Sequence, residues 1–250
     1  MKALKLIVSL GLLTSLGAAA AADAPVAHWT YSGHGGPAEW AALNPEFATC
    51  KRGKHQSPID IHGAKTADLP AIKFNYQPTP LAVIDNGHTI QVNYAPGSWI
   101  DVGGTRYDLV QFHFHRPSEE KIDGKSHAMV AHLLHQNADG KIAVVAVLLD
   151  GGGSSATIDT IWKNLPKEKD KQIVVPQTSI DASTLLPKDH GYYTFQGSLT
   201  IPPCSEDVTW LVLKSPMRIS DDEVARFASI YPMNARPTQP LNHRLIEVSK

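Results

Sequence analysis

The sequence predicts a mainly β protein, folded as a single domain with a few short helices. From residue 59 onward, short segments of β-favouring residues alternate with turn-forming pairs such as Asn86-Gly87. Residues 142–149 form a continuous apolar run, which is typical of a strand buried on both faces. The 250-residue chain has no internal repeat and no long charged linker, so one domain is expected.

The individual elements follow from these patterns in chain order. Residues 23–55 are rich in Gly, Pro and His and are expected to be loop-like. Two segments, 157–164 and 220–229, are the helix candidates. Ser220 is placed to cap the second helix, with Glu223 three residues later completing a capping box. The predicted strands are 72–76, 81–85, 89–94, 106–115, 127–135 and 142–149.

The first 22 residues are interpreted as a secretory signal peptide, preceding a folded domain over 23–250. Lys2 and Lys5 give a positive start, an apolar stretch follows over 6–16, and small residues occupy 18–22. A membrane anchor is the alternative, but about 20 consecutive apolar residues are needed to span a bilayer. The protein is therefore expected to be periplasmic or secreted, without stable membrane insertion after cleavage.

The charge of the chain bears on its partners, and its cysteine content bears on a disulfide. Removal of the leader would change the net charge from −1 to −3, with 21 basic and 24 acidic residues remaining. Nothing in this balance suggests a nucleic-acid partner, which would require a clustered basic face. The two cysteines, Cys50 and Cys204, would be able to form a disulfide in an exported protein, whereas two buried thiols are the alternative.

The strongest chemical motif is the run Gln-Phe-His-Phe-His over 111–115. Strand alternation places His113 and His115 on one face, about 7 Å apart, and the two phenylalanines on the other. Two imidazoles on one face can share a metal ion. A catalytic zinc site would need a third ligand and an open fourth position.

A third histidine is available from the following strand. Asp123-Gly124 is a strong signal for a two-residue hairpin. In ideal register, this hairpin would place His132 directly opposite His115. Pro117 cannot donate to the ladder, and a bulge there would shift the register by one or two residues.

The ligand pattern leaves alternatives open. Each histidine alone is better explained as an ordinary polar residue on a solvated strand face. Imidazole also suits copper and nickel, and a pure metal carrier would use the same ligands.

Motifs spread in order along the chain are similar to those of one known family. They are the Trp29 to Trp40 opening and residues 56–61, 86–88, 111–115, 117–119, 197–200, 202–203, 208–210 and 234–237. In this order and near this spacing, the chain resembles the α-class carbonic anhydrases of exported bacterial type. The resemblance implies a central, largely antiparallel, twisted sheet of about ten strands.

The resemblance also implies an activity and a set of site residues. The activity is reversible hydration of carbon dioxide to bicarbonate and a proton, by attack of zinc-bound hydroxide. One Zn²⁺ per chain would be held by His113, His115 and His132. The resemblance implies Thr200 and Glu119 as catalytic residues and His88 as the proton shuttle. It also implies that Gln111 is a partner of His113 and that Cys50 and Cys204 form a disulfide. The substrate pocket that it implies is lined by Leu134, Val144, Leu199, Val208 and Trp210.

Three features depart from the family pattern: Val130, Ile201 in place of a polar residue that often follows the catalytic threonine, and a short loop between His115 and Ser118. Most members carry a glutamate two residues before the third zinc histidine, and this chain has Val130 there. Loss of such a ligand partner typically changes metal affinity or activity by about 10- to 100-fold, so weaker zinc binding is expected unless another acceptor replaces it.

Two other functions are possible for this sequence: a binding module on the same fold and a periplasmic zinc store. Retention of all three histidines argues against an inactive relative. A zinc store would not explain Thr200, Glu119 or His88. Weak ester hydrolysis is a plausible side activity, and a homodimer is left open because bacterial members are often dimers.

Overall fold

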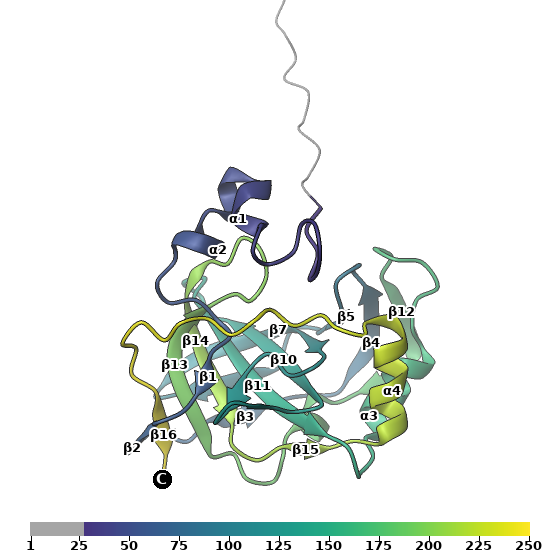
Figure 1. Cartoon of the computed structure of the whole chain (residues 1–250). Coiled ribbons are helices and arrows are strands. Elements are labelled where there is room, and N and C mark those ends of the chain that lie inside the picture. The colour runs from purple at the N-terminus through teal and green to yellow at the C-terminus, as the bar shows by residue number, and fades with distance from the viewer. Residues whose placement is uncertain (1–27) are drawn as a thin grey trace, which may run out of the picture.

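The computed structural model describes residues 28–250 and confirms the mainly β, single-domain prediction (Figure 1). The predicted signal peptide, 1–22, lies outside the described residues. Among residues 28–250, no helix is both long enough and apolar enough to cross a membrane.

A twisted sheet forms the centre of the molecule. Its main path has ten strands in the order β12-β4-β5-β7-β10-β11-β14-β13-β16-β2. Within this path, only the β11–β14 and β16–β2 pairs are parallel, so the sheet is largely antiparallel as expected. The ten strands are β12 (Ile173–Ile180), β4 (Thr79–Asp85), β5 (Ile90–Asn93), β7 (Thr105–His115), β10 (Met129–Gln136), β11 (Ile142–Asp150), β14 (Glu206–Leu213), β13 (Tyr192–Ser198), β16 (Glu247–Ser249) and β2 (Lys65–Ala67).

Short strands complete the β structure. Three join the main sheet off this path: β3 (Lys73–Asn75), β6 (Trp99–Val102) and β15 (Met217–Arg218). A separate three-stranded sheet contains β1 (Asp60–Ile61), β8 (Lys121–Ile122) and β9 (Lys125–Ser126).

The central strand β11 separates two apolar cores, as its continuous apolar run predicts. Val145, Val147 and Leu149 face one core, which also contains apolar residues of α3 (Ala156–Lys163) and α4 (Asp221–Ile230). Val144 and Ala146 face the other core, which includes Trp210 of β14. Because both faces of β11 are buried, its neighbours β10 and β14 are held in fixed positions.

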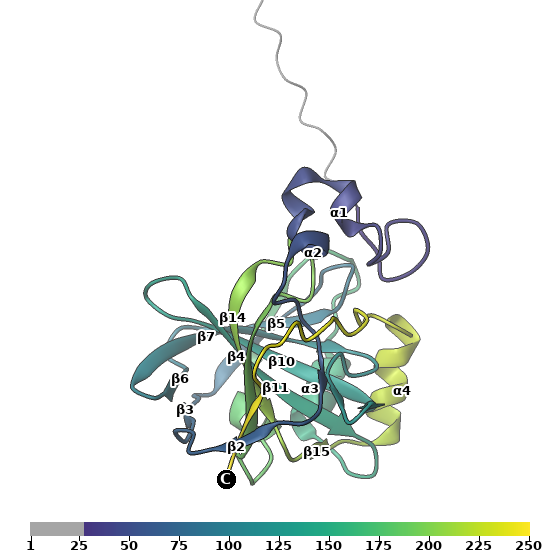
Figure 2. The same ribbon diagram turned by 60° about the vertical axis from the view of Figure 1, so that its left-hand side comes forward.

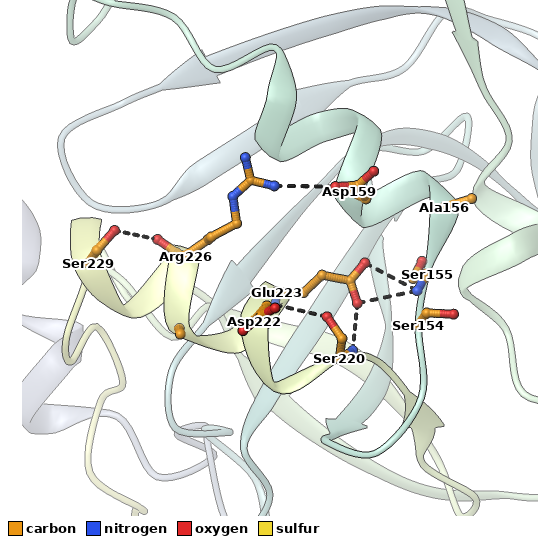
Figure 3. A pocket seen from close by; sticks show the side chains of 10 residues that line it. Ser154, Ser155, Ala156, Asp159, Ser220, Asp222, Glu223, Arg226 and Ser229 are labelled. Atoms are coloured by element: carbon orange, nitrogen blue, oxygen red, sulfur yellow. Dashed lines mark hydrogen bonds and ion pairs between the residues drawn. The ribbon is translucent and has the colours of Figure 1, made fainter.

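The predicted capping box at Ser220 is confirmed, and its glutamate serves two helices. Glu223 accepts from the Ser220 backbone N–H at 2.6 Å and from that of Ser155, the N-cap of α3, at 3.1 Å (Figure 3). A carboxylate is stabilised at helix N-termini by their partial positive charge. Glu223 therefore joins α3 to α4, which lie together at one side of the sheet (Figure 2).

The loop prediction for residues 23–55 was wrong in part. Three single-turn helices occur there: α1 (Trp40–Leu43), the 3₁₀ helix η1 (Pro45–Phe47) and α2 (Thr49–Arg52); a further 3₁₀ helix, η2 (Ala182–Leu185), lies elsewhere. Segments this short contain too few turns to give a periodic apolar pattern. The side chain of Asn44 caps η1, and the buried Trp40 donates to the Thr30 carbonyl at 2.9 Å.

The hairpin that carries His132 takes the shifted register expected from a bulge near Pro117, and not the ideal one that would pair His132 with His115. Close to the turn the register is ideal, with Lys121 opposite Ser126. Further along, Val130 lies opposite His115 and His132 opposite His113, a shift of two residues. Between the paired residues His115 and Val130 and the paired residues Lys121 and Ser126, the first side has five residues, 116–120, and the second has three, 127–129. The two extra residues therefore fall within 116–120. An even shift keeps His132 on the expected face.

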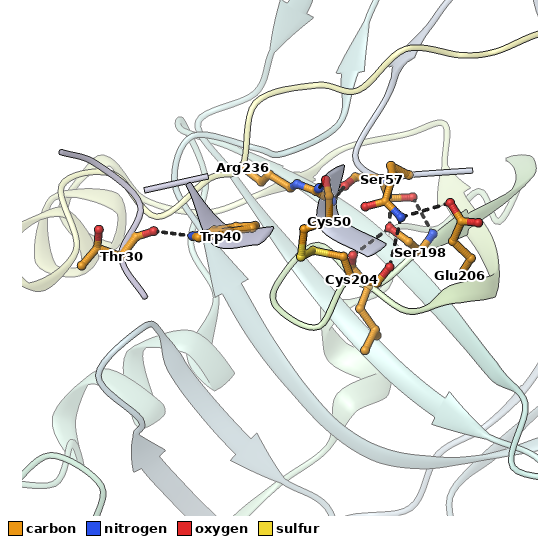
Figure 4. The surroundings of a disulfide bond; sticks show 10 residues. Thr30, Trp40, Cys50, Ser57, Ser198, Cys204, Glu206 and Arg236 are labelled. Carbon is orange, nitrogen blue, oxygen red and sulfur yellow. Dashed lines mark hydrogen bonds between the residues drawn. A yellow bond between two sulfur atoms is a disulfide. The ribbon is translucent and has the colours of Figure 1, made fainter. Parts of the chain in front are cut away.

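Cys50 and Cys204 form a disulfide, with their Cα atoms 4.9 Å apart. The bridge ties α2 to the loop between β13 and β14, which contains Thr200 (Figure 4). Around it, Arg236 donates to the Cys50 carbonyl at 3.0 Å, and Gln56 donates to the Cys204 carbonyl at 3.0 Å. The two segments are thus joined by a covalent bond, and a buried side chain donates to the carbonyl of each cysteine.

Loss of this disulfide is expected to lower stability strongly. The bridge closes a loop of 154 residues, for which the chain-entropy model gives up to about 5 kcal/mol of stabilisation. The double variant Cys50→Ser/Cys204→Ser is expected to unfold at lower urea concentration than the wild type. An unchanged midpoint, in the variant or in fully reduced wild type, would contradict this prediction.

Candidate metal centre

Three histidines meet on one face of the central sheet. His113 and His115 lie on β7, and His132 lies on β10 with its Cα paired to that of His113. One ring nitrogen of each lies within 4.8 Å of the corresponding nitrogens of the other two. The site is therefore built on paired central strands, whose positions are fixed by buried neighbours on both sides.

The second nitrogen of each ring is held by an acceptor. His113 Nδ1 donates to Gln111 Oε1 at 2.8 Å, and His115 Nδ1 donates to the Asn234 carbonyl at 2.8 Å. Because these oxygens can only accept, both rings carry hydrogen on Nδ1 and present the lone pair of Nε2 to the centre. Gln111 thus lies where the resemblance placed it, beside His113.

His132 has the opposite orientation. Its Nε2 lies 3.1 Å from both carboxylate oxygens of Glu120, which leaves Nδ1 facing the other two rings. Burial alone would lower the pKa of His132, but the charge and hydrogen bond of Glu120, together with Glu119, raise it above its usual value. Glu120 was not predicted from the sequence.

His113 and His115 are in surroundings that favour neutral imidazole. Burial, with a contribution from His132, lowers the pKa of His113 to about 3. The same causes, and the nearby His113, hold the pKa of His115 well below its usual value. Neutral rings are the form that binds a metal ion, because the lone pair must be free.

The donor set fits a zinc ion. His115 Nε2 is buried and has no hydrogen-bond partner, which is costly for a polar atom unless a ligand satisfies it. Three imidazole nitrogens, each with its second nitrogen oriented by an acceptor, match a catalytic zinc site with an open fourth position. The cluster of candidate ligands consists of histidines alone, His113, His115 and His132.

Glu119 and Thr200 lie beside the three histidines. Glu119 is buried and accepts from the Arg236 backbone N–H at 2.7 Å, and the Thr200 side chain lies close enough to lower its pKa. Its Oε2 lies 3.5 Å from His115 Nε2. Burial raises the pKa of Glu119 to about 7, against the opposing effects of His132, Thr200 and the Arg236 N–H.

His88 lies in the turn between β4 and β5, at the end of the sheet near His115. Thr89, its neighbour, donates to the Phe114 carbonyl at 2.5 Å. The His88 ring is half-buried and stacks on Trp29, with centroids 3.6 Å apart. Burial lowers the pKa of His88, and His28 adds to this effect. At neutral pH the ring is therefore mostly neutral and able to accept a proton.

The predicted pocket residues form an apolar wall next to the histidines. Leu134, Val144 and Trp210 are consecutive cross-strand partners on β10, β11 and β14. Their row lies two residues along the sheet from the row of His113 and His132. The Trp210 ring contacts that of His132 edge-on, with centroids 4.9 Å apart. Val208 is buried and Leu199 partly buried in the same apolar cluster.

Sequence reasoning missed three contributors to the site, Glu120, Asn234 and the stacking of Trp29 on His88. Glu120 directly follows a predicted site residue, but nothing in its sequence neighbourhood distinguishes it from an exposed glutamate. Asn234 acts through its backbone carbonyl, which is independent of residue type. Trp29 belongs to the Trp29 to Trp40 motif shared with the family, so this motif could have indicated that Trp29 lies near the site.

Comparison with known proteins identifies close relatives. Residues 35–250 match the family model for eukaryotic-type carbonic anhydrase. A carbonic anhydrase of Neisseria gonorrhoeae is 44% identical, covering 94% of this chain and 93% of that protein. The solved structure of a hyperthermostable carbonic anhydrase from a hydrothermal vent chimney superposes with a TM-score of 0.86 at 45% identity, covering 89% of this chain and all of that chain. The α-carbonic anhydrase of Thermovibrio ammonificans, solved with the inhibitor sulfanilamide, has a TM-score of 0.84 at 40% identity, covering 90% and 99%.

Proposed function

Because the chain belongs to the eukaryotic-type, or α-class, carbonic anhydrases, we propose that it hydrates carbon dioxide reversibly with one zinc ion per chain. His113, His115 and His132 would hold the ion through Nε2, Nε2 and Nδ1. When bound, zinc supplies Lewis acidity that makes hydroxide available from water near neutral pH, a property long known for this enzyme family. The observation that carries the proposal is the convergence of these three oriented nitrogens.

Thr200 and Glu119 would orient the nucleophile. When the Thr200 hydroxyl donates to the Glu119 carboxylate, its oxygen can only accept a further hydrogen bond. A hydroxide beside it must then direct its hydrogen toward Thr200 and a lone pair toward the substrate. This alignment lowers the barrier because the reacting atoms are held in an attack geometry before reaction.

The apolar wall of Leu134, Val144 and Trp210 would receive carbon dioxide. This substrate has no net dipole and forms only weak hydrogen bonds, so a dry apolar surface beside the nucleophile binds it without desolvating polar groups. Bicarbonate is charged and well hydrated, and the same wall disfavours it. Release of product is thus aided by the surface that binds the substrate.

His88 would carry the proton to solvent. Each hydration event produces one proton, which must leave before the next cycle. A half-buried imidazole with a lowered pKa accepts a proton at the site and loses it readily to buffer. Its stacking on Trp29 offers a stable resting position for the ring.

Export is proposed for this enzyme as well. The leader-like residues 1–22 and the disulfide between Cys50 and Cys204 both suit the periplasm or the medium, because disulfides persist in oxidising compartments.

Removal of the metal tests the proposal. Dialysis against a zinc chelator is expected to abolish carbon dioxide hydration, and one equivalent of zinc per chain to restore it. Stopped-flow hydration assays with metal analysis would follow both steps. Hydration that persists at full rate in protein containing less than about one-hundredth of an equivalent of any metal would contradict the proposal.

A further inference from the structure

Glu120 is placed to fix the orientation of His132. Both of its carboxylate oxygens lie 3.1 Å from His132 Nε2, and the side chain is fully buried. Only a donating Nε2–H satisfies this arrangement, so Nδ1 is left with its lone pair toward His113 and His115. Without an acceptor at Nε2, either nitrogen of the ring could carry the hydrogen.

The strand that carries His132 offers no such acceptor. Val130 lies on the same face of β10, two residues before His132, and is fully buried. It packs in an apolar cluster with Ile59, Ile61 and Leu148. Position 130 therefore supplies no carboxylate to His132, and the apolar side chain of Val130 fills the space beside this histidine.

The segment 116–120 supplies the carboxylate instead. Ser118 holds its shape, since the Ser118 hydroxyl donates to the Glu120 carbonyl at 2.7 Å and accepts from the His127 N–H at 2.9 Å. The two-residue register shift described above arises in this segment. It brings two consecutive carboxylates to His132: Glu119 Oε2 lies 3.9 Å from Nδ1 of the ring, and Glu120 is hydrogen-bonded to Nε2.

We propose that Glu120 is the positioning residue for His132, and that Glu120 and Val130 form an exchanged pair in which the carboxylate comes from the loop and the apolar residue from the strand. Glu120 acts through His132 and does not touch the substrate. The part of this inference that concerns zinc affinity rests on the proposed function. The part that concerns the ring orientation does not.

Zinc affinity measured by competition with a chromophoric chelator tests the first part. Glu120→Val is expected to bind zinc about 10- to 100-fold more weakly than the wild type, because His132 is no longer held. Glu120→Gln, which preserves shape and an acceptor oxygen, is expected to lose less. The exchange variant Glu120→Val/Val130→Glu is expected to return to within a few fold of the wild type.

A matched control separates positioning from general destabilisation. Glu223→Gln alters another buried carboxylate, in the helix cap far from the histidines, and is expected to lower stability while leaving zinc affinity unchanged. If Glu120→Val does not fold, comparison of Glu120→Gln with the wild type decides. Zinc affinity that is unchanged in a folded Glu120 variant, or not regained in the exchange variant, would overturn the inference.

The ring orientation can be read without any metal. Long-range ¹H–¹⁵N spectra of the metal-free protein at alkaline pH report which nitrogen of His132 carries hydrogen. The wild type is expected to show the Nε2–H tautomer, and Glu120→Val a mixture or the Nδ1–H form. An unchanged Nε2–H tautomer in Glu120→Val would refute the positioning role, whether or not the protein binds zinc. Failure of the wild type to bind zinc would count against the proposed function and not against the positioning role.

Discussion

Replacing His113 by alanine is expected to remove nearly all carbon dioxide hydration together with bound zinc. Zinc binding in protein sites of four ligands amounts to about 10–16 kcal/mol, or roughly 2.5–4 kcal/mol per ligand. Loss of one ligand should therefore weaken zinc binding by about 10²- to 10³-fold. His113 lies on the central strand β7, between its paired neighbours β5 and β10. Metal analysis and stopped-flow assays of the same sample measure both effects.

A partly buried histidine outside the cluster provides the control for this substitution. His127 pairs with Asp150 at 2.9 Å, apart from the three ligands, and His127→Ala should retain zinc and most activity. Far-UV circular dichroism would verify that both variants fold. If His113→Ala kept stoichiometric zinc and wild-type hydration, the three histidines would not be the catalytic metal centre.

Replacing Thr200 by valine is expected to slow hydration by about 10²-fold while zinc remains bound. Valine matches threonine in shape but removes the hydroxyl that we propose links Glu119 to the nucleophile. Loss of one oriented hydrogen bond at a reacting group typically costs a factor of 10²–10³ in rate. Thr200 is buried in the loop braced by the disulfide, so the substitution should change the fold little.

Two further variants show whether Thr200 and Glu119 act as a unit. Thr200→Ser keeps the hydroxyl and should retain much of the activity. Glu119→Gln should lower the rate, and the double variant Thr200→Val/Glu119→Gln should be little worse than Thr200→Val alone, because coupled residues are not additive. Fully additive losses in rate would contradict the proposed hydrogen-bond relay.

The parts of the fold predictable from sequence were those with strong local patterns. The apolar run over 142–149 indicated a strand buried on both faces, and Ser220 with Glu223 indicated a capped helix. The single-turn helices over 40–52 were missed because a single turn has no measurable periodicity. Strands after residue 150 were expected only from the family resemblance.

The candidate site was predictable to the extent that its residues lie on regular strands. Alternation placed His113 and His115 correctly on one face, and the hairpin signal indicated a third histidine nearby. The hairpin signal alone does not determine that residues 116–120 shift the register by two. For the same reason it could not see Glu120, whose role depends on a contact across twelve residues that only the folded chain creates.

The central claim, that three histidines hold a zinc ion for catalysis, is tested most directly on the unmodified protein. Stopped-flow carbon dioxide hydration and zinc content would be measured on one purified sample. Rapid hydration with about one zinc ion per chain is expected. Stoichiometric zinc without hydration would contradict it and would favour a storage or binding role for the same three histidines.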